Sequence, residues 1–181
     1  MLLHNEPRTE LVFVDENARP GETLFGFRVL SRVTEPVDGM VIAVGDNRKR
    51  KEIFVGADRS SVLAVVSNRA YLGRGCRLGD GVFVAHTCHV GPLAIIGDNV
   101  ILNSGSIVGH ETTIGSHSHI CPNVTVAGRA QIGELVFIGA GATVIDGVCI
   151  CPEVVVGAGA TVFKDITAPG TYFGTPARRI K

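Results

Sequence analysis

At 181 residues and 19.0 kDa, the chain suits one domain with a sizeable core, or one domain with a small appendage. Its 17 basic and 17 acidic side chains cancel, so no global charge attracts nucleic acid or an acidic membrane as a partner. No apolar run approaches the ~20 residues of a membrane span. The start also lacks the basic-then-apolar order of a signal peptide, which favours a cytoplasmic location.

Charge is distributed unevenly along the chain. More than half of the charged side chains lie within residues 1–60, and a repeat governs the sequence beyond that point. We therefore expect an N-terminal subdomain over residues 1–60, a repeat domain over 61–166 and a C-terminal tail over 167–181.

The N-terminal part resembles a small α/β unit in its pattern. Two apolar runs, residues 11–15 and 41–45, are typical of short buried parallel strands, and residues 46–54 of a helix that opens on the second strand. The basic run 48–51 in this helix is more typical of a solvated helix face than of a binding patch. The start of this helix, after Gly45, is suited to a phosphate group.

A six-residue repeat dominates the rest of the chain. Every sixth position from Val66 to Val162 is Val, Leu or Ile, at seventeen consecutive positions, and Gly commonly follows. This period fits neither an α-helix nor a hairpin meander. It predicts short strands separated by turns and stacked as a parallel β-helix, in which each coil buries its face against its neighbours.

Three hexapeptides per coil of about 18 residues would stack the outward side chains into three ladders. Only the first ladder is continuously apolar: Phe83, Ile101, His119, Phe137 and Val155. Such stripes usually mark an interface. The alternative is that the stripe packs beneath the N-terminal subdomain or the C-terminal tail.

The candidate catalytic residues lie where the repeat carries the fewest charges. Between residues 99 and 128, Glu111 is the only formal charge, and it follows His110 directly. A histidine beside a carboxylate suits a general base, because the anion stabilises the imidazolium that forms on proton abstraction. The alternative is a solvated histidine at a corner of the coil.

The residues around this pair resemble a known family. The run ILNSGSIVGHETTIG (101–115) is similar to the active-site coil of the sialic acid O-acetyltransferases and bacillosamine-type nucleotide-amino-sugar N-acetyltransferases. The similarity continues at 118–119, 126–128, 137–140, 156–160 and in the tail 174–178. It covers about residues 40–181, and its specific part is the spacing from Asn103 to His110–Glu111 and His119.

The resemblance implies a mainly β fold: a left-handed parallel β-helix with a small, truncated α/β N-terminal subdomain, assembled as a homotrimer with the apolar ladder at the contact. It implies that His110 is the general base that deprotonates the acceptor, and that Glu111 orients His110 or raises its basicity. Asn103 would assist on the acceptor side. The implied transfer is direct, without an acyl-enzyme.

Acetyl-CoA is the implied cosubstrate. The resemblance places it in a groove between two subunits, with its acetyl carbonyl bonded to His119 and its length along the backbone at Gly128, Ala140 and Ala158. Family members hold the sugar nucleotide with an additional N-terminal strand and a glycine-rich loop, for which the ten residues before Leu11 leave no room. Asp15 and Gly45 match the remaining substrate-side positions, although the subdomain could equally be a structural cap.

The expected function is therefore acetyl transfer to the amine of a nucleotide-linked amino sugar used in bacterial surface glycans. One alternative is O-acetylation of sialic acid or a similar free sugar, and another is a non-catalytic β-helix scaffold. A zinc hydratase of the γ-carbonic-anhydrase type is disfavoured, because the ligand positions two coils after His86 and His89 hold Pro122 and Thr125. The cysteines, odd in number and without C-x-x-C spacing, also give no reason to expect a metal.

Overall fold

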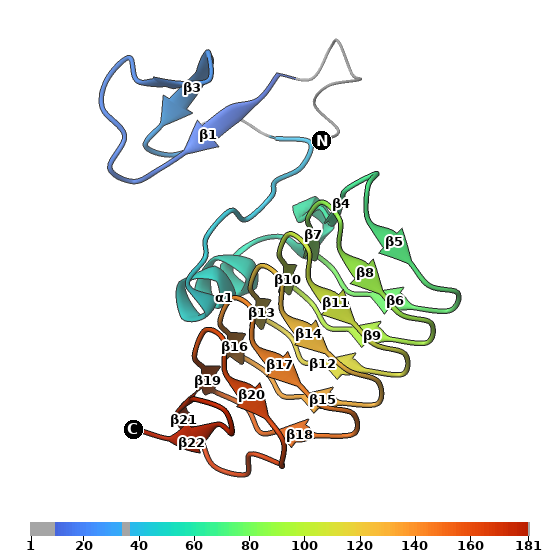
Figure 1. The fold of residues 1–181 in the computed structure, drawn as a ribbon. Helices are drawn as coiled ribbons and strands as arrows, with labels where there is room; N and C mark the ends of the chain where they lie inside the picture. Colours follow the sequence, from blue (N-terminus) through green and yellow to red (C-terminus); the bar gives the residue numbers. More distant parts are fainter. Residues whose placement is uncertain (1–9, 34–36, 181) are drawn as a thin grey trace. The chain divides into compact units, whose positions relative to one another are not determined.

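The computed structural model describes residues 10–33 and 37–180 (Figure 1). The chain forms two compact units, which divide between Asp38 and Gly39. This division by compactness differs from the boundary at residue 60 expected from charge, because residues 39–60 pack with the repeat that follows them.

The first unit is a small β-sheet. Within residues 10–33 its strand order is β1-β3-β2, where β1 is Val12–Val14, β2 is Thr23–Leu24 and β3 is Phe27–Leu30. Strands β1 and β3 are parallel, and β2 and β3 form a tight antiparallel hairpin. The strand expected over 11–15 is thus confirmed, but its partner is β3 and it is only half-buried.

The second expected strand, over residues 41–45, is wrong. These residues have no strand pairing, and only Met40 forms an isolated bridge, to Val62. The carbonyl oxygens of Val44 and Gly45 instead accept hydrogen bonds from the Arg50 guanidinium, at 3.1 Å each. The Arg50 side chain thus supplies hydrogen bonds that a neighbouring strand would otherwise supply. Sequence periodicity does not reveal such a contact.

The expected helix is confirmed as α1, Asn47–Gly56. Asp46 caps it by accepting a hydrogen bond from the backbone N–H of Lys49 at 2.8 Å. A 3-10 turn, Arg59–Ser61, follows and leads into the repeat. Helix α1 lies in the second unit, so the first unit contains no helix within its described residues.

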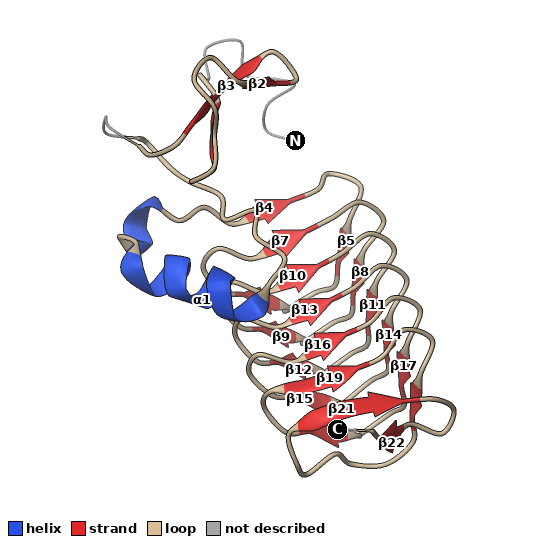
Figure 2. Cartoon of the chain, turned by 90° about the vertical axis from the view of Figure 1, so that its left-hand side faces the viewer, coloured by secondary structure: helices blue, strands red, loops and turns tan. Residues whose placement is uncertain are grey.

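The repeat forms a parallel β-helix, as the period predicts (Figure 2). Over residues 65–162, all of them described, seventeen strands fall into three sheets, named here C, D and E. Sheet C contains β4 (Val65–Val66), β7 (Phe83–Val84), β10 (Ile101–Leu102), β13 (His119–Ile120), β16 (Phe137–Ile138) and β19 (Val154–Val156). Sheet D contains β5 (Tyr71–Leu72), β8 (His89–Val90), β11 (Ile107–Val108), β14 (Thr125–Val126), β17 (Thr143–Val144) and β20 (Thr161–Val162). Sheet E contains β6 (Arg77–Leu78), β9 (Ile95–Ile96), β12 (Thr113–Ile114), β15 (Gln131–Ile132) and β18 (Cys149–Ile150).

The strand register confirms the stacking expected from the sequence. In sheet C, Ile101 pairs with Phe83 and His119, and Phe137 pairs with His119 and Val155. The aliphatic residues at every sixth position point inward, and those of the central coils are at most 3% exposed. Burial of each such side chain contributes about 1.5–3 kcal/mol to the free energy of unfolding. Because these side chains stack coil upon coil, the core is a column rather than a sphere.

The tail closes the C-terminal end of this column. Strand β21 (Gly170–Phe173) pairs in parallel with β19, and β22 (Arg178–Arg179) pairs antiparallel with β21. Residues 170–179 of the tail therefore extend sheet C. In the part of the chain that the structure describes, no helix has the length and apolar character needed to cross a membrane.

The basic run 48–51 is only partly the solvated face expected from the sequence. Arg50 is 1% exposed, and its guanidinium donates to the carbonyl oxygens of Asn99 at 3.1 Å and His117 at 2.7 Å. Burial lowers the pKa of Arg50 to about 10, partly offset by Asp46, so the group stays charged at neutral pH. Arg50 thus fastens α1 to the β-helix.

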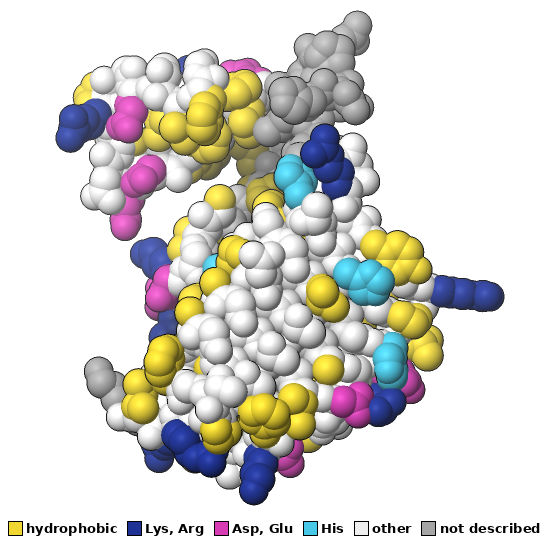
Figure 3. All heavy atoms as spheres, in the orientation of Figure 1, with side chains coloured by type: hydrophobic (Ala, Val, Ile, Leu, Met, Phe, Trp, Pro, Cys, Tyr) yellow, Lys and Arg dark blue, Asp and Glu magenta, His cyan; other side chains and the backbone are white. Residues whose placement is uncertain are grey.

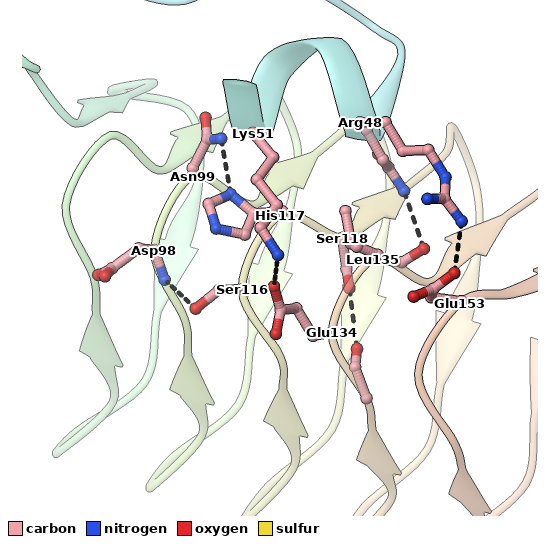
Figure 4. Close-up of polar contacts among 12 residues, drawn as sticks. Arg48, Lys51, Asp98, Asn99, Ser116, His117, Ser118, Glu134, Leu135 and Glu153 are labelled. Carbon is pink, nitrogen blue, oxygen red and sulfur yellow. Dashed lines mark hydrogen bonds and ion pairs between the residues drawn. The ribbon is translucent and has the colours of Figure 1, made fainter. Parts of the chain in front are cut away.

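Two ion pairs also join α1 to the β-helix (Figure 4). Lys51 pairs with Glu134 at 2.6 Å, and Arg48 pairs with Glu153. Asn47 adds a hydrogen bond from its amide to the carbonyl oxygen of Val136 at 3.1 Å. Helix α1 and the residues before it therefore contact sheet C and the corner next to it. For the middle of the apolar ladder, this contact corresponds to the alternative in which the ladder packs beneath the N-terminal subdomain.

Candidate active site

His110 and Glu111 lie at the corner between β11 and β12. The His110 Nδ1 atom is 2.9 Å from the Glu111 carboxylate, and the two side chains are 47% and 53% exposed. A carboxylate only accepts, so Nδ1 carries the proton and the lone pair of the neutral ring is on Nε2. The pair therefore presents one basic nitrogen in a fixed orientation.

The ring of His110 lies on the backbone of the next coil. A Cβ atom at Gly128 would stand 2.6 Å from His110 Nε2, closer than real contacts allow. Gly128 is buried, and the neighbouring Arg129 N–H donates to the His110 carbonyl oxygen at 2.8 Å. The structure thus brings His110 and Gly128 together, and the missing side chain at Gly128 fixes where Nε2 can lie.

Gly128→Ala is expected to lower kcat by about 100-fold, because the added Cβ displaces the His110 ring by about an ångström. Only the end of a flexible side chain must move, so thermal stability should change little. The matched control is Gly56→Ala, where a Cβ meets nothing within 4 Å. Steady-state kinetics of both variants check this, and equal kcat values for wild type and Gly128→Ala would contradict it.

A second group of residues lies on sheet C. His119 is 9% exposed and packs edge-on against Phe137, with ring centroids 5.4 Å apart. Its Nδ1 atom is 3.4 Å from the Gly45 carbonyl oxygen, and its Nε2 atom is 3.3 Å from the Asn103 side-chain nitrogen. Burial lowers the pKa of His119, which keeps the ring neutral near pH 7. Three of the expected site residues, Asn103, His119 and Gly45, are therefore in contact.

The remaining expected residues occupy separate places. Ala140 and Ala158 are exposed and lie in successive coils at the corner that also carries Asn103, between sheets C and D. Asp15 belongs to the first unit, where its carboxylate accepts from the Asn17 N–H at 2.8 Å. The described residues bring His110 and His119 into no direct contact, because His119 points outward from sheet C and His110 from the corner between sheets D and E.

A hollow of about 420 Å³ opens beside Gly45 and the start of α1. Its lining comes from two regions of the chain: Gly45, Asp46, Asn47 and Arg48, and Leu135, Phe137, Glu153 and Val155. It adjoins the His119 group through Gly45 and Phe137. Its lining mixes polar and charged side chains with the apolar side chains of Leu135, Phe137 and Val155.

The sequence did not single out the polar cluster beneath α1. His117 is 6% exposed, its Nδ1 atom accepts a hydrogen bond from the Asn99 side-chain amide at 2.8 Å, and its ring packs edge-on against Phe54. Burial lowers the pKa of His117. The only signal in the sequence was the crowding of histidines in this stretch. Among the described residues, no group of three or more His, Cys, Asp or Glu side chains could hold a metal ion.

The two buried histidines predict acid sensitivity. Their lowered pKa values mean that the unfolded chain binds protons at a pH where the folded chain does not. The free energy of unfolding therefore falls as the pH drops below the ordinary histidine value of about 6.5. Calorimetry should show Tm falling between about pH 7 and about pH 5, less steeply in His117→Gln. Identical slopes for wild type and variant would contradict the assignment.

The chain is similar to known bacterial transferases. The family model "Bacterial transferase hexapeptide (six repeats)" matches residues 93–128 and 129–164. The crystal structure of PerB from Caulobacter crescentus, in complex with CoA and GDP-perosamine, is 33% identical over 78% of this chain and 69% of that chain, with a TM-score of 0.76. The acetyltransferase domain of PglB from Neisseria gonorrhoeae is 26% identical over 94% of this chain and 87% of that domain, with a TM-score of 0.88. A search of curated protein sequences finds no match.

The repeats and the coil geometry define a hexapeptide-repeat transferase. Within that class, the chain belongs to the bacillosamine-type family of nucleotide-amino-sugar N-acetyltransferases. It is similar to the perosamine N-acetyltransferase PerB and to the PglB acetyltransferase domain.

Proposed function

We propose that this chain transfers the acetyl group of acetyl-CoA to the amine of a nucleotide-linked amino sugar. The observation that carries the proposal is the His110–Glu111 pair, with Nδ1 bonded to the carboxylate and Nε2 free to act as a base. The chain is also similar to a perosamine N-acetyltransferase solved with CoA and GDP-perosamine. Because acetyl-CoA is a cytoplasmic metabolite, we place the enzyme in the cytoplasm.

The reaction moves one proton from the amine to the thiol and replaces the C–S bond of the thioester with a C–N bond. The lone pair of the neutral amine attacks the thioester carbonyl, and His110 Nε2 accepts the proton that the amine nitrogen loses. As the tetrahedral intermediate collapses, the C–S bond breaks and the imidazolium returns the proton to the departing thiolate. Glu111 keeps the ring in the required tautomer and stabilises its transient positive charge. No acyl-enzyme is needed.

For the cosubstrate, we propose a path along the small residues next to the site. Ala140 and Ala158 are exposed at the corner of their coils, so a pantetheine arm can approach the backbone there. Gly128 instead lies beneath the His110 ring, and its contribution is to place the base beside the thioester. For the acceptor we propose the hollow beside Gly45.

We propose further that the enzyme is a homotrimer whose subunits share each active site. Asn103 and His110 lie at opposite ends of the β11 segment, at the two edges of sheet D. In a ring of three subunits assembled about sheet D, the His110 edge of one subunit meets the Asn103 edge of the next. Charged side chains lie mainly around the margins of this face (Figure 3), and Ile107 at its centre is 45% exposed. Sheet D therefore suits the contact better than sheet C, part of which α1 covers.

Ile107→Asp is expected to dissociate the trimer, because it places a charge at the centre of the contact. Light scattering at micromolar concentration should give the mass of a trimer for wild type and of a monomer for this variant, which should also lose activity. Val155→Asp is the matched control on sheet C, where Val155 is 39% exposed. A monomeric wild type, or dissociation by Val155→Asp alone, would contradict the arrangement.

The function is tested by release of the CoA thiol from acetyl-CoA in the presence of UDP-, dTDP- and GDP-linked amino sugars and of free sialic acid. The proposal expects release with at least one nucleotide-linked amino sugar. Release with sialic acid alone would assign an O-acetyltransferase instead. A protein that neither binds acetyl-CoA nor releases thiol with any acceptor would be a scaffold.

A further inference from the structure

Among the described residues, the Oδ1 atom of Asn99 is the only buried side-chain oxygen or nitrogen that lacks a hydrogen-bond partner. Asn99 is 1% exposed, and the nitrogen of its side-chain amide makes two hydrogen bonds. This nitrogen donates to the Arg50 carbonyl oxygen at 3.2 Å and to His117 Nδ1 at 2.8 Å. A buried acceptor without a partner costs about 1–3 kcal/mol. The two acceptors therefore orient the amide at the expense of its own oxygen.

The Arg50 carbonyl fixes the orientation of this amide while His117 is neutral. Turning the amide over would set Asn99 Oδ1 against the Arg50 carbonyl oxygen, so that two acceptors would face each other. The nitrogen therefore faces both partners, His117 Nδ1 presents its lone pair, and the hydrogen of the neutral ring is on Nε2. The bond from Asn99 to Arg50 thus requires the neutral form of His117.

Protonation of His117 reverses the requirement at Nδ1. An imidazolium donates at both ring nitrogens, so Nδ1 then needs an acceptor instead of a donor. The unpartnered Oδ1 at the other end of the Asn99 amide is such an acceptor. When the amide turns over, Oδ1 gains the hydrogen bond that it lacks, and the Arg50 carbonyl oxygen loses its bond from Asn99.

Charged groups of α1 and of the neighbouring coils face the His117 ring. The cations are Arg50 and Lys51, and the anions are Glu134 and Asp98. Burial is the largest cause of the lowered pKa of His117, the two cations lower it further, and the two anions partly offset them. Protonation therefore takes place below the ordinary histidine value of about 6.5.

The helix that this amide contacts also positions the hollow proposed for the acceptor. The Arg50 carbonyl belongs to α1, and the Arg50 guanidinium donates to the Gly45 carbonyl oxygen at 3.1 Å. Gly45 and the first residues of α1 line the hollow. Because residues 41–45 form no strand pairing, a displacement of α1 moves Gly45 with it.

We propose that Asn99 and His117 are a pH-dependent pair of positioning residues, which holds α1 and the acceptor hollow in place while His117 is neutral. When His117 is protonated, Asn99 turns from the Arg50 carbonyl to the imidazolium, α1 loses this bond, and the acceptor binds more weakly. The effect on acceptor binding rests on the proposed acetyl transfer, whereas the rearrangement of the amide does not depend on it.

NMR of the ¹⁵N-labelled full chain tests the rearrangement without any substrate. Near neutral pH, His117 should be unprotonated at Nδ1 and protonated at Nε2. On acidification, protonation of Nδ1 and the change in the Asn99 side-chain amide resonances should share one midpoint, below about pH 6.5. Hydrogen exchange of the α1 amides, corrected for its intrinsic pH dependence, should become about 3- to 10-fold faster, because about one hydrogen bond is lost. Asn99 resonances that do not follow His117 would overturn the proposal.

Two variants change this response in opposite ways. His117→Phe keeps a ring against Phe54 but takes up no proton, so the corrected α1 exchange should no longer depend on pH. Asn99→Asp places a carboxylate beside Nδ1, which favours the imidazolium, so the midpoint should move to higher pH. The matched control is His86→Ala, which removes a histidine bonded to the Ser67 hydroxyl and should respond as wild type does. An unchanged response in His117→Phe, or a lost response in His86→Ala, would overturn the pair.

The functional readout is the KM for a GDP-linked 4-amino sugar. As the pH falls through the His117 midpoint, KM should rise about 3- to 10-fold more in wild type than in His117→Phe. Titration of the acceptor amine and of His110 affects both proteins alike, so the ratio of the two KM values isolates His117. A ratio that does not change with pH would overturn the proposal. The expected NMR response in a protein that acetylates no acceptor would support the rearrangement and refute the proposed function.

Discussion

His110→Ala is expected to lower kcat by about 10²–10⁴-fold, the usual contribution of a positioned general base. The loss should appear in kcat rather than in the binding of acetyl-CoA, because the imidazole acts on the proton of the acceptor. Its Nε2 atom is the one basic position that the Glu111 contact leaves open. Single-turnover rates and a binding titration with acetyl-CoA measure the two quantities separately.

The control for this prediction is His86→Ala. His86 lies in an earlier coil, where its Nδ1 atom contacts the Ser67 hydroxyl at 2.6 Å, away from Glu111 and Gly128. Its removal should leave kcat near the wild-type value. If His110→Ala also retained wild-type turnover, the assignment of the base would be wrong.

Arg50→Ala is expected to lower the free energy of unfolding by about 3–5 kcal/mol. The guanidinium donates to carbonyl oxygens of Val44, Gly45, Asn99 and His117, and its removal leaves buried acceptors without partners. The substitution also opens a cavity beneath α1, since the side chain is 1% exposed. This is the largest stability effect that we expect from a single polar residue.

Lys49→Ala is the matched control for Arg50→Ala, because Lys49 is on the same helix and exposed. Its effect should stay within about 0.5 kcal/mol. Urea unfolding followed by circular dichroism measures both variants. A loss below about 1 kcal/mol for Arg50→Ala would mean that water or backbone rearrangement replaces the guanidinium.

The β-helix was predictable because its signal is local and repeated. Each inward aliphatic residue specifies one strand, and seventeen of them in register leave one architecture that buries them all. The His110–Glu111 pair was predictable for a similar reason, since the two residues are adjacent in sequence and meet at one corner.

The sequence-based predictions were wrong where contacts join segments that are distant in the sequence. Residues 41–45 have the composition of a strand, but the Arg50 side chain satisfies two of their carbonyl groups and these residues form no strand pairing. Arg50 itself follows Arg48 and Lys49 in a run typical of a solvated face, and only the fold shows that it points into the protein. The contact from His119 to Gly45 spans 74 residues and has no periodic signature.

Acetyl transfer to an amine of a nucleotide sugar is tested most directly by the mass and alkali stability of the product. The wild-type protein is incubated with acetyl-CoA and a GDP-linked 4-amino sugar, and the nucleotide sugar is isolated. We expect its mass to increase by one acetyl group that survives mild alkali, as an amide does, and no such product with His110→Ala. An unchanged nucleotide sugar across UDP-, dTDP- and GDP-linked amines, or an acetyl group lost in mild alkali as an ester, would contradict N-acetylation by this site.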